Sequence, residues 1–288
     1  MSRFQSAEEF EKSLETYVLD RAAAEGREPP ELRSEIAYER FLARMDPEQM
    51  TVKGGYAVKA QVPVSPHTKD IDVIITEEQH SEKGQLPRII RDLLNDRLEQ
   101  AQVNDHFRFD TGEALGFSDL EPKEIAARVS VRAYIGDSRE RLSSFPLDVA
   151  VAEGHVLPPK IVTAPNHLSW ADIDSAQMSV VPPEHLFADK LLIYVESMSQ
   201  NRIGDLAHMV LLAEQGLDHE KVAAALSRFA DERGLSSRIL EPLTEPPEEW
   251  APRFDRIMPG ARNIALEKAF DRISSVLEQI RARGLLGA

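Results

Sequence analysis

Two acidic residues stand at the start of an apolar stretch, and their spacing suggests metal chemistry. Asp70 and Asp72 lie two positions apart, and Val-Ile-Ile follows them. On a strand, residues i and i+2 point to the same face, so the two carboxylates are expected to project side by side. Adjacent carboxylates repel each other unless a cation compensates them. Mg²⁺, which takes oxygen ligands and completes its shell with phosphates, suits such a pair.

A third acidic residue lies further along the chain, inside a second apolar run. Residues 145–151 read Phe-Pro-Leu-Asp-Val-Ala-Val, with Asp148 at their centre. A charge in the middle of a buried strand is costly unless it has a partner. The partner could be a metal ion or the cation of a buried salt bridge, and the run alone leaves both open.

A pair of glycines precedes the first two acidic residues. Gly54 and Gly55 lie between the β-favouring residues 51–53 and a helix-compatible piece, residues 56–60. Glycines at such a turn let backbone N–H groups approach a phosphate with no Cβ in the way. Lys59, one helical turn further on, could reach the phosphates or could be a solvated charge. A phosphate-binding turn beside paired carboxylates suggests nucleotide chemistry.

The Lys-Gly-Gly turn followed by Asp-Ile-Asp resembles the polymerase-β-like nucleotidyltransferases. More narrowly, it resembles the AbiEii/AbiGii (MenT-type) toxins of bacterial toxin–antitoxin systems, and the match extends from about Leu32 to Ala213. This resemblance implies an NTP donor and Mg²⁺ or Mn²⁺ bound by Asp70, Asp72 and Asp148. It also implies that Thr68 lies beside the nucleotide phosphates, although a loop threonine could equally cap the following strand.

The resemblance includes a second block of motifs. Glu-His-Leu-Phe-Ala-Asp-Lys, residues 184–190, matches a family helix whose lysine faces the active site, so Lys190 is expected to bind the triphosphate. An ordinary ion pair with a helical neighbour is the alternative. Arg202 and Asp205 match the family pattern Arg-x-Lys-Asp-x-x-Asp, and Asp205 could act as a base, orient Lys190 or cap a helix. Gly204 and His208 depart from the pattern, which leaves the acceptor chemistry open.

The elements around these residues indicate an α+β fold. We expect a polymerase-β-like nucleotidyltransferase core with a mixed sheet over residues 1–181 and a helical C-terminal lobe over residues 182–288. Apolar periodicity predicts helices near 6–25, 31–45, 86–102, 218–233 and 261–283, the first of them opened by the capping-box pattern Ser-Ala-Glu-Glu at residues 6–9. Pro-Pro-Glu at residues 182–184 is expected to start a further helix. Strands are expected over residues 106–109, 125–135 and 145–151. A proline-rich joint is expected over residues 241–252.

Composition narrows the classes of protein. The chain has 288 residues, no cysteine and a formal net charge of −15. The absence of cysteine excludes disulfides and thiolate metal sites. No apolar run approaches the length of a bilayer span, so no membrane association and a cytoplasmic location are expected. The negative charge disfavours broad, nonspecific nucleic-acid binding.

The leading hypothesis is a metal-dependent transfer of NMP from an NTP to an acceptor hydroxyl. The resemblance implies a tRNA 3′ end as acceptor, and a toxin held in check by a cognate antitoxin. In a second hypothesis the acceptor is a small alcohol or a protein hydroxyl, which the negative charge favours. In a third, the chain is a non-catalytic module that binds a nucleotide or a partner.

Overall fold

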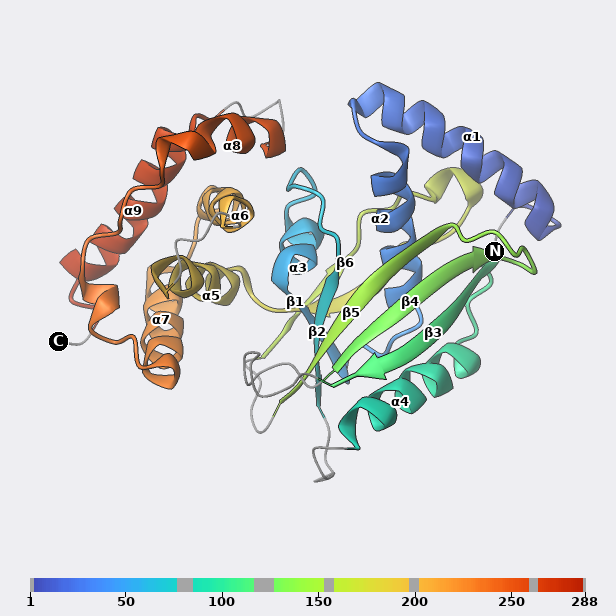
Figure 1. Ribbon diagram of the computed structural model, residues 1–288, viewed down its shortest axis with the longest axis horizontal. Coiled ribbons are helices and arrows are strands. Elements are labelled where there is room, and N and C mark those ends of the chain that lie inside the picture. Colours follow the sequence, from blue (N-terminus) through green and yellow to red (C-terminus); the bar gives the residue numbers. More distant parts are fainter. Residues whose placement is uncertain are drawn as a thin grey trace. The chain divides into compact units, whose positions relative to one another are not determined.

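The computed structural model describes residues 3–76, 85–116, 127–152, 158–196, 202–258 and 264–286 (Figure 1). The chain forms two compact units. Unit 1 comprises Met1–Tyr56 and His67–Val180, and unit 2 comprises Ala57–Pro66 and Val181–Ala288. The segment 57–66 thus groups with the C-terminal residues. The division after residue 181 that the sequence suggests stays a prediction.

Unit 1 is built on one mixed sheet. In the described residues seven strands form it, in the order β3-β4-β5-β2-β1-β7-β6. Neighbouring strands pair antiparallel, except that β2–β5 and β1–β7 are parallel. The strands are β1 (Met50–Lys53), β2 (Ile71–Thr76), β3 (Phe107–Leu115), β4 (Ala127–Ile135), β5 (Ser143–Ala152), β6 (Lys160–Thr163) and β7 (Gln177–Val180).

The two faces of this sheet differ in polarity. On β4 every second residue is buried, and Val129 and Val131 pair with the buried Leu147 and Phe145 of β5. The alternate residues of β4, Arg128 and Ser130 among them, are exposed or partly exposed. This alternation confirms the strand expected there, although residues 125 and 126 of that prediction lie outside the described residues.

Helices cover the apolar face. They are α1 (Ala7–Glu25), α2 (Pro29–Leu42) and α4 (Leu86–Gln100), with a short 3-10 helix, η1 (Ser169–Ala171). The ring of Phe41 on α2 packs edge-on against Phe109 of β3 and Phe145 of β5. Helix α4 packs against β3 and β4, and Figure 1 shows it beside β3. Ser6 caps α1 by accepting a hydrogen bond from the Glu9 backbone N–H, as the capping-box pattern predicts.

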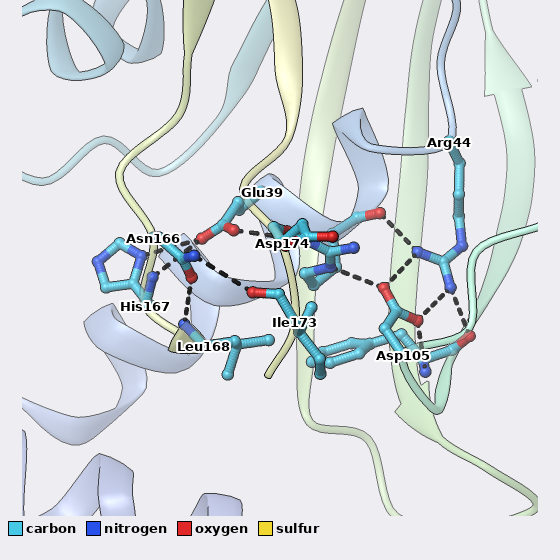
Figure 2. A network of polar contacts seen from close by, with 10 residues as sticks. Glu39, Arg44, Asp105, Asn166, His167, Leu168, Ile173 and Asp174 are labelled. Atoms are coloured by element: carbon cyan, nitrogen blue, oxygen red, sulfur yellow. Dashed lines mark hydrogen bonds and ion pairs between the residues drawn. The ribbon is translucent and has the colours of Figure 1, made fainter. Parts of the chain in front are cut away.

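A buried charged network fixes α2 against the loops beside it (Figure 2). Asp105 is 1% exposed and accepts from Arg40 Nε at 2.7 Å and from Arg44 Nη2 at 2.6 Å. Glu39 is also fully buried, and its Oε2 lies 3.2 Å from His167 Nδ1. Because buried charges are tolerated only with partners, this network specifies where α2 lies in unit 1.

Unit 2 is helical in its described residues. It contains α5 (Pro183–Glu196), α6 (Ile203–Ala213), α7 (His219–Arg233), α8 (Ala251–Ile257) and α9 (Leu266–Ala282), and the 3-10 helices η2 (Arg238–Leu240) and η3 (Glu248–Trp250). Helix α6 is buried along almost its whole length and contacts α5, α8 and α9. A helix that is apolar on all sides belongs at the centre of a bundle.

Several expected boundaries differ from the structure. Strand β3 extends to Leu115, well beyond the expected end at Phe109. Helix α8 begins inside the predicted proline-rich joint, with Pro252 in its first turn, where a proline lacks no hydrogen bond that the helix needs. Helix α9 begins at Leu266, and residues 261–263 of the expected helix lie outside the described residues. In the described ranges no helix is long and apolar enough to cross a bilayer.

Candidate active site

Two of the expected carboxylates lie on neighbouring strands of unit 1. Asp72 on β2 is the in-register partner of Asp148 on the parallel strand β5. In-register partners of adjacent strands point to the same side of the sheet. Their neighbours Val73 and Val149 point to the other side and are fully buried. The fold therefore brings together two acidic residues that are 76 positions apart in the sequence.

Gly54 lies against the Asp72 carboxylate. Its φ of +64° is in the left-handed region, which favours glycine. A Cβ at this position would lie 1.9 Å from Asp72 Oδ2. Position 54, in the turn between β1 and α3 (Gly54–Gln61), thus requires glycine for two independent reasons: the backbone conformation and the contact with Asp72. The sequence predicted this strand–turn–helix, but it attributed the glycine to phosphate approach alone; the structure adds the room that Asp72 needs.

Asp148 is held by an arginine. Arg128 on β4 is its in-register partner, and Arg128 Nε and Nη2 each donate to one carboxylate oxygen at 2.6 Å. The Asp148 side chain is 5% exposed and that of Arg128 is 47% exposed. The salt bridge that the sequence left open as an alternative is therefore present, with its carboxylate buried and its guanidinium half exposed.

Asp70 and Thr68 lie in the loop before the first carboxylate strand. β2 begins at Ile71, so Asp70 precedes the strand instead of sharing it with Asp72. Thr68 Oγ1 donates to the Asp70 carbonyl at 3.3 Å, and Tyr38 Oη donates to the Thr68 carbonyl at 3.2 Å. Burial, then the negative charges of Asp70 and Glu35, raise the pKa of Tyr38. The phenol therefore stays protonated and anchors this loop to α2.

The second motif block forms a cluster within unit 2. Lys190 is 6% exposed, and its Nζ lies 2.7 Å from Asp205 Oδ1. Arg202 Nη1 lies 3.4 Å from the other oxygen of Asp205. Arg202 is the N-cap residue of α6, and that helix has no side-chain cap. Asp205 therefore contacts Lys190 and Arg202 and does not cap the helix, and its roles as a base or in orienting Lys190 stay predictions.

Lys59 and His208 lie near this cluster. Lys59 is 8% exposed and donates to the Ser65 carbonyl at 2.9 Å. His208 is 6% exposed, and within the described residues neither ring nitrogen has a hydrogen-bond partner. Burial, then the positive charges of Lys190 and Lys59, hold the pKa of His208 well below its ordinary value. His208 is therefore neutral at pH 7, where the family pattern has a negative aspartate.

The donor set suits a hard divalent cation through two carboxylates. No three His, Cys, Asp or Glu side chains in the described ranges gather closely enough to hold a metal ion. Asp70 lies outside β2, and Arg128 binds Asp148. Mg²⁺ does not need such a cage, since it is usually bound by one or two carboxylates and substrate phosphates. Asp72 and Asp148 fit that pattern, and the metal assignment stays a prediction.

Sequence reasoning missed two groups that the structure places beside these residues. Arg128 stands out in the sequence only as a polar position in the alternation of β4. Tyr38 looks like one more apolar residue of α2, and only its hydrogen bond to Thr68 reveals its role. Strand register and loop contacts, which no local pattern specifies, were needed to find either.

Comparison with known protein families identifies the family of this chain. The family model described as "Nucleotidyl transferase AbiEii toxin, Type IV TA system" matches residues 38–275. The chain belongs to this family. Membership makes it a nucleotidyltransferase toxin of a type IV toxin–antitoxin system, and it implies an NTP substrate and an antitoxin partner.

Two solved structures are similar to this chain in fold. The nucleotidyltransferase toxin MenT4 of Mycobacterium tuberculosis H37Rv superposes with a TM-score of 0.60 at 13% identity, over 94% of this chain and 93% of that one. JHP933 from Helicobacter pylori gives a TM-score of 0.45 at 14% identity, over 85% and 89%. No curated protein matches the sequence. The likeness to MenT4 confirms the expected α+β nucleotidyltransferase fold.

Proposed function

We propose that this AbiEii-family chain transfers a nucleoside monophosphate from an NTP to the 3′ hydroxyl of tRNA, and that it requires Mg²⁺ or Mn²⁺. One observation supports the site most strongly: Asp72 and Asp148 are in-register partners, and Asp72 lies against the turn at Gly54. Two carboxylates beside a glycine turn can serve a metal-bound triphosphate. A divalent ion there would polarise the α-phosphate and stabilise the leaving pyrophosphate.

The residues of unit 1 have distinct tasks in this proposal. Asp72 and Asp148 would hold the cation. The backbone N–H groups of Gly54 and Gly55 would bind the phosphates, since glycine leaves no Cβ to block them. Asp70 and Thr68 are assigned to the same site, from the loop that Tyr38 anchors. In the reaction the acceptor oxygen bonds to the α-phosphorus, the bond to the β-phosphate oxygen breaks, and a site carboxylate accepts the hydroxyl proton.

The residues of unit 2 are assigned to the phosphates. Lys59, Lys190 and Arg202 are the cations of this set, and Asp205 holds Lys190 in one orientation. A lysine fixed in this way neutralises phosphate charge without reorganising during the reaction. Neutral His208 leaves this cluster with less negative charge than the family pattern gives it, which favours binding of an anion.

A second acceptor class is supported by the charge of the chain. The formal net charge of −15 opposes the approach of a large polyanion. A small alcohol or a protein hydroxyl would not meet that repulsion. The two hypotheses share donor, metal and carboxylates, and they differ only in the molecule that becomes labelled.

The decisive experiment follows label from donor to acceptor. The purified chain is incubated with each α-³²P-labelled NTP, Mg²⁺ or Mn²⁺, and total tRNA. We expect label on tRNA, and no label on tRNA whose 3′ diol has been oxidised by periodate. Label on protein or on small alcohols alone supports the second acceptor class. Absence of label from every acceptor with every nucleotide and both metals refutes the proposal.

A matched pair of variants tests the site in the same assay. Asp72→Asn keeps the shape of the side chain and removes the charge, and we expect it to abolish transfer. Asp110→Asn is the control, because Asp110 is also a strand carboxylate paired with an arginine, Arg108, and lies outside the proposed site. Equal loss in both variants would mean that the sheet, and not the site, was damaged.

A further inference from the structure

Charged residues form a row across four adjacent strands of unit 1. Lys53 on β1 pairs in register with Asp72 on β2, Asp72 with Asp148 on β5, and Asp148 with Arg128 on β4. In-register neighbours share a face, so the row reads cation, anion, anion, cation on the side opposite the buried core. The two carboxylates at its centre are the pair assigned to the metal.

The contact at one end of this row has the geometry that a metal ion would replace. The Arg128 guanidinium donates through two nitrogens to both oxygens of Asp148, each at 2.6 Å. Such forked, charge-assisted contacts are the strong class of hydrogen bond. An oxygen that accepts a short bond from Arg128 has less capacity to ligate a cation. The guanidinium therefore competes with the ion for Asp148.

The exposure of the two side chains shows which of them can move. Asp148 is 5% exposed, on a central strand, whereas the Arg128 side chain is 47% exposed. A long side chain at the surface can swing away from its partner without disturbing the sheet. After release, its charge remains close to the place where substrate phosphates arrive.

We infer that Arg128 is a latch that holds Asp148 until a divalent cation and its nucleotide displace it, after which the freed guanidinium contacts the nucleotide phosphates. The inference rests on the proposed metal role of Asp72 and Asp148. It makes Arg128 a positioning residue that weakens binding of the metal alone. It also couples the two ligands, because each favours the released arginine and therefore the binding of the other.

Metal affinity, and not activity, is the test. Free Mn²⁺ is measured by electron paramagnetic resonance during titration of wild type, Arg128→Gln, Arg128→Lys and Arg132→Gln. We expect Arg128→Gln to bind Mn²⁺ about tenfold more tightly, the loss of one charge-assisted contact that competed with the ion. Arg128→Lys, which keeps the charge and loses the fork, should fall between. Arg132→Gln, on the same strand and face, should match wild type.

Two further readouts protect the test against a simple loss of folding. Arg128→Gln leaves Asp148 without its cation, so its Tm in EDTA should fall, and Mn²⁺ should raise that Tm more than it raises the wild-type Tm. A non-hydrolysable NTP should also improve Mn²⁺ binding more in wild type than in Arg128→Gln. If Arg128 only stabilised the sheet, Arg128→Gln should bind Mn²⁺ more weakly than wild type.

The outcomes separate the latch from the proposed function. Mn²⁺ binding that Asp72→Asn abolishes, but that Arg128→Gln leaves unchanged or weakens, overturns the latch and keeps the metal site. Absence of Mn²⁺ binding in both wild type and Arg128→Gln, with and without the nucleotide, overturns the metal role of the carboxylates and the latch with it. Tighter binding in Arg132→Gln as well would show a general effect of surface charge and would also overturn the latch.

Discussion

The contact between Gly54 and Asp72 makes a quantitative prediction about Gly54→Ala. Alanine at a φ of +64° costs about 1–2 kcal/mol, because the left-handed conformation brings Cβ against the backbone. The new Cβ would also meet Asp72 Oδ2 at 1.9 Å, and overpacking typically costs about 1–3 kcal/mol. We therefore expect a loss of about 2–5 kcal/mol in the free energy of unfolding.

Gly26→Ala is the matched control for this variant. Gly26 caps α1 with the same φ of +64°, but nothing lies within 4 Å of an added Cβ. It should lose only the conformational part, about 1–2 kcal/mol. The difference between the two variants, measured by urea unfolding, then isolates the contact with Asp72.

A double-mutant cycle refines the measurement. Asp72→Ala removes the Oδ2 and Cγ atoms that an added Cβ would meet, and leaves the Asp72 Cβ at 3.1 Å. In that background Gly54→Ala should cost little more than Gly26→Ala, so the two substitutions should couple favourably by about 1–3 kcal/mol. The reasoning fails if Gly54→Ala costs no more than Gly26→Ala, or if its cost is the same in the Asp72→Ala background.

Three further predictions concern buried charges. Burial and the positive charges of two lysines lower the pKa of His208, so below about pH 6.5 the unfolded chain binds a proton that the folded chain does not. The free energy of unfolding should therefore fall as the pH drops below about 6.5. His208→Leu should reduce this dependence on pH, measured by urea unfolding at several pH values. An unchanged dependence on pH would contradict this. Asp105→Asn removes the buried anion that Arg40 and Arg44 share and leaves Arg40 the longer, 3.5 Å ion pair with Glu39, so it should cost about 3–5 kcal/mol. Glu8→Gln, which removes the exposed ion pair with Lys12, is the control and should not change the free energy of unfolding measurably. Equal losses in Asp105→Asn and Glu8→Gln would show that burial does not decide the cost. Asp205→Asn removes the partner of buried Lys190 and should cost about 1–3 kcal/mol by urea unfolding; a neutral result would show that Lys190 does not depend on Asp205.

The sequence predicted what depends on local pattern. The alternation of Val129, Val131 and Ala133 predicted β4, and the cap at Ser6 predicted the start of α1. The glycine pair and the apolar run after Asp72 predicted the turn and the strand of the candidate site. Each of these signals lies within a few residues of the feature it specifies.

The register of the strands and the contacts of the loops could not be predicted from local sequence patterns. Nothing in the sequence states that Arg128, Asp148 and Asp72 are in-register partners, because register depends on pairing between strands far apart in the chain. Asp70 was placed on the strand because the Asp-x-Asp spacing fits one, and the loop that Tyr38 anchors ends only after it. Helix α8 was missed because its prolines suggested a joint, although proline is well tolerated in a first turn.

The grouping of residues 57–66 with unit 2 has a consequence for anyone who dissects this toxin. The polypeptide passes from one unit to the other after Tyr56, after Pro66 and after Val180. A fragment that begins at residue 181 would therefore lack Lys59 and the loop that binds it. The other fragment, residues 1–180, would carry residues 57–66 without the rest of the unit to which they belong. Neither half can be excised with a single cut, so separate expression of the halves should give insoluble material, whereas substitutions within the intact chain keep both units complete.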